Sequence, residues 1–153
     1  MELKARLQAA TKEAMKARQT ERLSTLRLIA AAIKDREIAA RGGDGDGTLS
    51  EADLIAILSK MVKQRQESAK AYEEGGRLEL AEKEEAEIGI IQEFLPRQLS
   101  AAETDAAIDA AIAALGATGI RDMGRVMAEL RDRHAGQMDF GAVGPMVKAR
   151  LLN

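Results

Sequence analysis

Apolar residues recur every three or four positions along the first part of the chain, a spacing that places them on one face of an α-helix. Residues 2–18 and 20–41 each carry such a stripe, and four glycines between residues 42 and 47 should end the second one. We therefore predict two amphipathic helices here. Their stripes are Leu3, Leu7, Ala10, Ala14 and Ala17, followed by Leu26, Ile29, Ala30 and Ile33.

Two further helices are expected before residue 95. Ser50, with Asp53 three residues later, is typical of a capping box, so a third helix should begin there and end at Glu74, before a Gly-Gly pair. A fourth stripe, over residues 77–95, should end where Pro96 follows, because the residue before a proline is disfavoured in helical conformation.

The segment 96–99 is the best candidate for a hinge, since capped helices lie on both sides of it. Ser100 and Glu103 form a second capping box, and Gly116 provides a typical helix C-cap. These signals predict a fifth helix between them.

The last part of the chain carries two more apolar stripes. Asp122 should cap a short helix that Gly136 closes, and Asp139 should cap the final segment. We expect Pro145 to divide that segment into a short turn and a helix, because proline removes a backbone donor.

These elements predict an all-α fold. An N-terminal bundle of about four helices would occupy residues 1–95, and a C-terminal three-helix module residues 100–153. The composition agrees, because 29 of 153 residues are Ala and only four are Val. No apolar run approaches the roughly 20 residues that span a bilayer, so we expect a cytoplasmic protein without a membrane partner.

Charge is distributed unevenly, although the net charge is only -2. Residues 1–41 carry ten basic and five acidic side chains, whereas residues 73–93 carry two and eight. The two segments could pack side by side and neutralise each other, or the basic one could bind a polyanion. Arg27, Lys34 and Arg41 are seven residues apart, which would align them on one side of a helix.

The glycine-rich loop after residue 41 contains Asp44 and Asp46 and resembles the middle of a calcium-binding EF-hand loop. Aligning the required glycine with Gly47 places Gly42 at the first ligand position and Asp53 where a bidentate Glu is needed. We therefore favour a flexible loop whose end caps a helix, and we predict no metal.

Few side chains suit catalysis. The chain has no Cys and a single His, so the usual zinc sets, thiolate nucleophiles and hydrolytic triads cannot be assembled. No phosphate-binding glycine loop of the standard kinds is present either. We predict no catalytic residue and no cofactor.

Arg65 falls on the apolar side of the third predicted helix, close to the line through Leu54 and Tyr72. A buried guanidinium requires a carboxylate, and Glu84 and Glu87 lie on the corresponding side of the fourth helix. Arg65 therefore pairs with one of them or faces a ligand in a polar cleft. Replacing Arg65 by Ala should lower the melting temperature only in the first case.

Several motifs in the same order together resemble the YqeY-like proteins of bacteria, which share a domain with the tail of the B subunit of the glutamine-dependent aminoacyl-tRNA amidotransferase. The resemblance spans essentially the whole chain, except for the loop over residues 42–47. The motifs are Leu26–Lys34, Lys63–Ser68, Gly76-Arg77 with Glu84 and Glu87, Phe94–Ser100 and Asp122–Met127.

This resemblance implies a non-catalytic accessory module that contacts tRNA and aids a synthetase or an amidotransferase subunit. By motif position, the contacts would come from Arg27, Lys34, Lys63, Arg65 and Arg125. One alternative is a helical adaptor that binds a protein through its acidic fourth helix and its small C-terminal module. Another is the homology-based activity of a carbon–nitrogen ligase with glutamine as amide donor.

Overall fold

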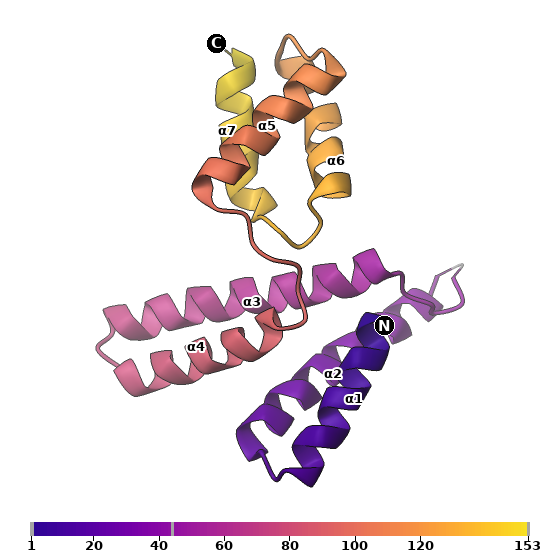
Figure 1. The fold of residues 1–153 in the computed structure, drawn as a ribbon, viewed down its shortest axis with the longest axis vertical. Coiled ribbons are helices and arrows are strands. Elements are labelled where there is room, and N and C mark those ends of the chain that lie inside the picture. The colour runs from indigo at the N-terminus through magenta and orange to yellow at the C-terminus, as the bar shows by residue number, and fades with distance from the viewer. Residues whose placement is uncertain (1, 44, 153) are drawn as a thin grey trace. The chain divides into compact units, whose positions relative to one another are not determined.

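The computed structural model describes residues 2–43 and 45–152, and within these ranges the chain is helical and contains no strand (Figure 1). The prediction of an all-α fold is therefore confirmed. Contacts between Cα atoms divide the chain into two compact units, Met1–Leu95 and Pro96–Asn153, and each unit has its own apolar core.

The first unit is built from two helical hairpins. Helices α1 (Leu3–Lys16) and α2 (Thr20–Arg41) form one, and helices α3 (Glu51–Glu74) and α4 (Leu78–Gln92) form the other (Figure 1). Helix α2 packs against both α3 and α4, and the shared core is made of large aliphatic side chains. Its fully buried members include Leu26, Ile29, Leu58 and Ile91.

The stripe predicted for α2 needs one correction. Ala30 is exposed, whereas Thr25 is buried and belongs to the inner face of the helix. The Thr25 hydroxyl donates to the carbonyl of Glu21 at 3.3 Å, which satisfies its polar group inside the core.

Helix α4 ends at Gln92 rather than at Leu95. Pro96 excludes helical geometry at the residue before it, and the last three residues tighten into turns in which each N–H bonds three residues back. This turn buries the Phe94 ring, and the Arg6 guanidinium lies 5.5 Å from its centroid.

The far part of the α3–α4 hairpin is held together by small side chains. Ala69 and Ala81 are buried there, yet neither belongs to the large aliphatic cluster of the unit. Small residues allow the two helices to approach closely. Because these alanines lie outside the shared core, this end of the hairpin is stabilised by packing between α3 and α4 alone.

The second unit contains helix α5 (Ala101–Leu115), the short 3-10 helix η1 (Ile120–Asp122), helix α6 (Met123–Arg133) and helix α7 (Phe140–Leu152). Helix α6 packs against both α5 and α7. The core of this unit contains Ile108, Val126, Leu130, Val143 and Val147.

Two sequence predictions in this unit are wrong. The Asp122 carboxylate does not cap α6 but accepts hydrogen bonds from the Thr118 and Gly119 N–H groups before η1. Pro145 lies inside a continuous α7 rather than dividing it. The Pro145 ring is exposed, and its lack of a backbone N–H removes only one hydrogen bond from α7. The opposite face of the helix is buried in the core of the unit.

Residues 97–99, within the predicted hinge 96–99, are hydrogen-bonded to the turn between α6 and α7. The Leu99 N–H donates to the Gln137 carbonyl at 2.9 Å, and Gln137 Nε2 donates to the Arg97 carbonyl at 3.1 Å. Gln98 Nε2 donates to the carbonyl of Gly136. These bonds attach the segment to the second unit, so a joint between the units would have to lie before Arg97.

Candidate functional site

The exposed face of α2 carries the basic row expected from the sequence. Arg27, Lys34 and Arg41 are all exposed, and none of them forms an ion pair with another described residue. At a rise of about 1.5 Å per residue, neighbours in the row are separated by roughly 10 Å along the helix. Exposed Ile38 lies on the same side of α2.

In the part of the chain that the structure describes, six of the twelve arginines outside this row have their charge compensated by a carboxylate. In the described residues these ion pairs measure 2.5 to 3.3 Å between nitrogen and oxygen. The α2 row is distinguished by the alignment of its cations on one helix face rather than by their lack of partners alone. The compensated pairs are Arg22–Glu93, Arg65–Glu87, Arg97–Glu103, Arg125–Asp122, Arg133–Glu129, and Arg150 with Asp105 and Asp109.

Arg65 points into the α3–α4 hairpin rather than toward the α2 row. Its Nε donates to Glu87 Oε2 at 3.1 Å, and its NH1 group donates to the Met61 carbonyl at 3.2 Å. The two charged side chains are only 15% and 18% exposed. Of the two carboxylates considered, Glu87 is the one in contact, and Glu84 is half-buried nearby on the same helix.

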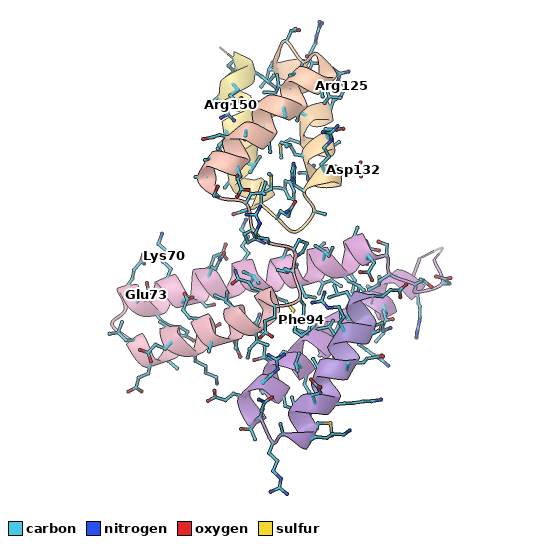
Figure 2. All side chains as sticks on the ribbon, in the orientation of Figure 1. Lys70, Glu73, Phe94, Arg125, Asp132 and Arg150 are labelled. Atoms are coloured by element: carbon cyan, nitrogen blue, oxygen red, sulfur yellow. The ribbon has the colours of Figure 1, made fainter. Side chains whose placement is uncertain are left out.

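The other two predicted contact residues belong to helices other than α2. Lys63 is exposed on α3, and Arg125 is exposed on α6 in the second unit. Arg125 is held 3.3 Å from Asp122 and donates to the Leu115 carbonyl at 3.2 Å, and its side chain lies at the surface of that unit (Figure 2). Within the first unit, the structure places Arg27, Lys34 and Arg41 on one face of α2.

The basic and acidic segments meet at one end of α4. The Glu93 carboxylate lies 2.7 Å from Arg22, and its carbonyl accepts from Arg6 at 3.2 Å. Of the other acidic residues of this helix, Glu87 pairs with Arg65 inside the hairpin, whereas in the described residues Glu79, Glu82, Glu84 and Glu85 form no ion pair. Lys70 and Glu73 likewise point away from α3 at the far end of the hairpin (Figure 2). Among the described residues, charge neutralisation between the basic and acidic segments is therefore confined to the Arg22–Glu93 ion pair.

The loop that resembles an EF-hand is only partly described, because Asp44 lies outside the described residues. Asp46 Oδ1 accepts from the Thr48 N–H at 2.9 Å, and this bond holds the pKa of Asp46 below its usual value. Asp53 exchanges hydrogen bonds with Ser50 in the capping box, which also lowers the pKa of Asp53. Over the part of the chain described, no three metal-binding side chains come together.

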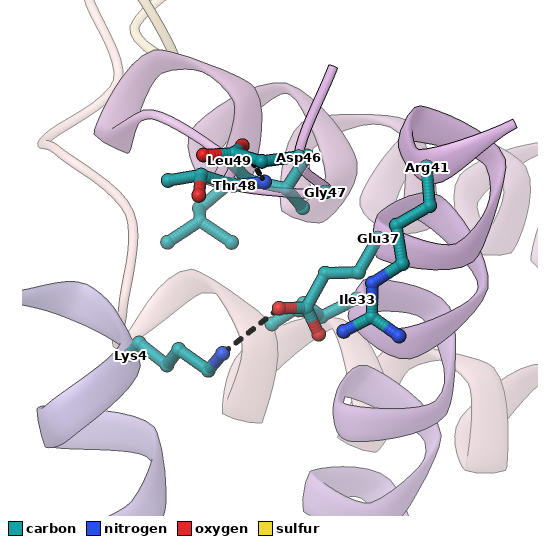
Figure 3. Close-up of a pocket in the computed structure, with 9 residues that line it drawn as sticks. Lys4, Ile33, Glu37, Arg41, Asp46, Gly47, Thr48 and Leu49 are labelled. Atoms are coloured by element: carbon teal, nitrogen blue, oxygen red, sulfur yellow. Dashed lines mark hydrogen bonds and ion pairs between the residues drawn. The ribbon is translucent and has the colours of Figure 1, made fainter. Parts of the chain in front are cut away.

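The same loop helps to form a cavity of about 280 Å³ beside the end of the basic row. Its walls come from the start of α1, the last turns of α2 and the segment 46–54 (Figure 3). Arg41, the last member of the row, lines it together with Lys4 and Asp46. Sequence reasoning missed this cavity because Lys4 and Asp46 belong to segments brought together only by the tertiary fold.

Over the described ranges, no helix combines the length and the apolar character that crossing a membrane requires.

Comparison with known proteins gives matches over nearly the whole chain. Residues 4–151 match the family described as Yqey-like protein. A relative from Lachancea thermotolerans, "Altered inheritance of mitochondria protein 41, mitochondrial", is 31% identical over 97% of this chain and 78% of its own length. A protein of the same name from Eremothecium gossypii is 34% identical over 82% of this chain and 68% of its own length.

These names correct the prediction of a cytoplasmic protein, because both relatives are named as mitochondrial. The prediction rested on the lack of a long apolar run. That feature argues against a membrane span but does not distinguish one aqueous compartment from another.

Proposed function

This chain belongs to the YqeY-like protein family, and we propose that it acts as a non-catalytic accessory module that binds tRNA through the exposed face of α2. One observation carries the proposal. Arg27, Lys34 and Arg41 are exposed in a row on one face of α2, without ion partners among the described residues. A synthetase or an amidotransferase subunit would supply the chemistry.

Phosphate contact is the expected mode of recognition. Uncompensated cations on a helix surface bind nucleic acid by displacing counterions, so affinity falls as salt rises. The whole chain has only one Tyr and two Phe, and Phe94 is buried, which leaves little surface for base stacking. We therefore expect recognition of tRNA shape and backbone rather than of base sequence.

A titration with bulk tRNA at 50 and 200 mM salt tests this proposal. The double variant Arg27→Gln/Lys34→Gln should weaken binding and flatten the salt dependence by about 1.5 in log–log slope, because two phosphate contacts are lost. Lys70→Gln/Lys83→Gln is the matched control, since it removes two exposed cations from the α3–α4 hairpin. The proposal fails if the chain does not bind at low salt, or if both variants lose equal affinity.

A protein-binding adaptor is the second candidate, and the α3–α4 hairpin favours it. Leu78 and Leu80 are exposed there, beside acidic side chains such as Glu82 and Glu85 that have no ion partner among the described residues. Glu82→Lys/Glu85→Lys should abolish capture of such a partner and leave tRNA affinity undiminished. Loss of capture in Arg27→Gln/Lys34→Gln instead would place the partner on α2.

The activity of a carbon–nitrogen ligase using glutamine is tested directly. The purified chain is incubated with glutamine, ATP and mischarged tRNA, without added subunits. We expect no amidated product, and its appearance would overturn the non-catalytic assignment.

A further inference from the structure

The cavity between α1, α2 and the following loop combines an apolar floor with a charged rim. Ile33 and Leu54 are buried core residues, and together with the half-buried Leu49 they form the apolar part of the wall. Its volume of about 280 Å³ is just below the lower end of the range for drug-sized ligands, roughly 300 Å³, so it suits a small metabolite.

Four charged side chains line the cavity, and two of them satisfy each other. Lys4 Nζ lies 3.0 Å from Glu37 Oε2. Arg41 and Asp46 form no ion pair, with each other or with any other residue that the structure describes. One rim therefore presents an uncompensated cation and an uncompensated anion to the same space (Figure 3).

The loop keeps Asp46 charged and oriented. Its Oδ1 accepts from the Thr48 N–H at 2.9 Å, and the Thr48 hydroxyl also bonds to this carboxylate. These bonds lower the pKa of Asp46, so the side chain is a carboxylate at neutral pH.

Gly47 allows the Arg41 side chain to lie against the loop. Its φ of +88° favours glycine, and the residue is buried. A Cβ at this position would come 2.5 Å from Arg41 Cγ and 2.7 Å from Arg41 Nε. The position of Arg41 in the cavity wall therefore depends on the absence of a side chain at residue 47.

We infer that this cavity binds a small aliphatic α-amino acid as a zwitterion. The carboxylate would pair with Arg41, the ammonium with Asp46, and the side chain would cover the apolar floor. A simple anion would pair with Arg41 alone, and a simple cation would pair with Asp46 alone. A zwitterion satisfies both charges at once.

Valine is the probe, and two analogues isolate its charges. Amide spectra of the ¹⁵N-labelled full chain would be recorded with valine, with isobutylamine, which lacks the carboxylate, and with 3-methylbutanoate, which lacks the ammonium. Saturable shifts should occur at the amides of residues 47–49 with valine, and both analogues should bind at least tenfold more weakly. Equal binding of 3-methylbutanoate or inorganic phosphate, or no shift with millimolar valine, would overturn the inference.

Asp46→Asn tests the site without touching the α2 row. Asn keeps the oxygen that accepts from Thr48 but removes the charge, so valine affinity should fall at least tenfold with an unchanged melting temperature. Gly47→Ala should have the same effect on valine through Arg41. Unchanged valine affinity in Asp46→Asn would contradict the inference.

The inference does not rest on the proposed tRNA contact, because Arg27 and Lys34 do not line the cavity. Asp46→Asn should leave tRNA affinity undiminished, whereas Arg27→Gln/Lys34→Gln should leave valine affinity unchanged. These variants therefore distinguish a failure of the valine site from a failure of the proposed tRNA contact.

Discussion

Replacing Arg65 by Met tests whether its ion pair with Glu87 stabilises the first unit. Methionine keeps most of the aliphatic volume but removes the charge and the bond from NH1 to the Met61 carbonyl. The Glu87 carboxylate, only 18% exposed, then loses its single described ion partner. The perturbation is therefore an uncompensated, largely buried charge rather than a cavity.

The size of the effect follows from the burial of the pair. Exposed ion pairs contribute about 0 to 1 kcal/mol, whereas breaking a fully buried pair costs about 3 to 5 kcal/mol. With side chains 15% and 18% exposed, this pair lies between these limits, and we expect a loss of about 2 kcal/mol. For a unit of this size, that corresponds to a melting temperature lower by roughly 8 to 16 °C.

Urea and thermal unfolding followed by amide signals of α3 and α4 measure this loss. Glu87→Gln should destabilise by a similar amount, and the double variant Arg65→Met/Glu87→Met should recover more than half of it, because neither charge remains buried alone. Arg27→Met is the matched control, since that arginine is exposed and unpaired among the described residues. An unchanged melting temperature in Arg65→Met would refute the reasoning and indicate that Arg65 faces a ligand instead.

Two further predictions concern the second unit. Hydrogen bonds from Arg97 and from the Ser100 N–H lower the pKa of Glu103 from 4.5 to about 2, so the stability it contributes is present above pH 4.5 and is lost as the pH falls toward 2. Urea unfolding of α5 from pH 7 to pH 2 should therefore show Glu103→Gln to be less stable than the wild type near neutrality, with a difference that shrinks as the pH falls toward 2. A constant difference would contradict this. Gly116→Ala should destabilise by about 1 kcal/mol because its φ is +60°, whereas Gly124→Ala, in helical geometry with open space at the Cβ position, should stabilise by about 0.5 kcal/mol in the same assay. Shifts of the same sign would be inconsistent with this account.

Local sequence signals predicted the helix boundaries well where the boundary is set by neighbouring residues. The capping boxes at Ser50 and Ser100 and the left-handed cap at Gly116 all occur as predicted, because each involves atoms within a few residues. Predictions failed where tertiary packing decides. Pro145 remains inside a helix held by its buried face, and α4 ends early as Phe94 turns into the core.

In the candidate site, too, local sequence signals predicted some features and tertiary packing decided the others. Helical periodicity was sufficient to predict that Arg27, Lys34 and Arg41 share one face, and that Arg65 points toward the interior. The cavity required the tertiary fold, because residues near position 4 and position 46 meet only after α1 and α2 have packed. The independent folding of residues 1–95 and 100–153 stays a prediction.

The buried alanines of α3 and α4 imply that the two ends of this hairpin do not unfold together. Ala69 and Ala81 bury far less apolar area than the leucines and isoleucines near the other end, so separating the outer turns costs much less free energy than unfolding the whole unit. Amide protons there should exchange with solvent through local fraying. Transient separation of these turns would present the acidic side chains of this end in more than one geometry.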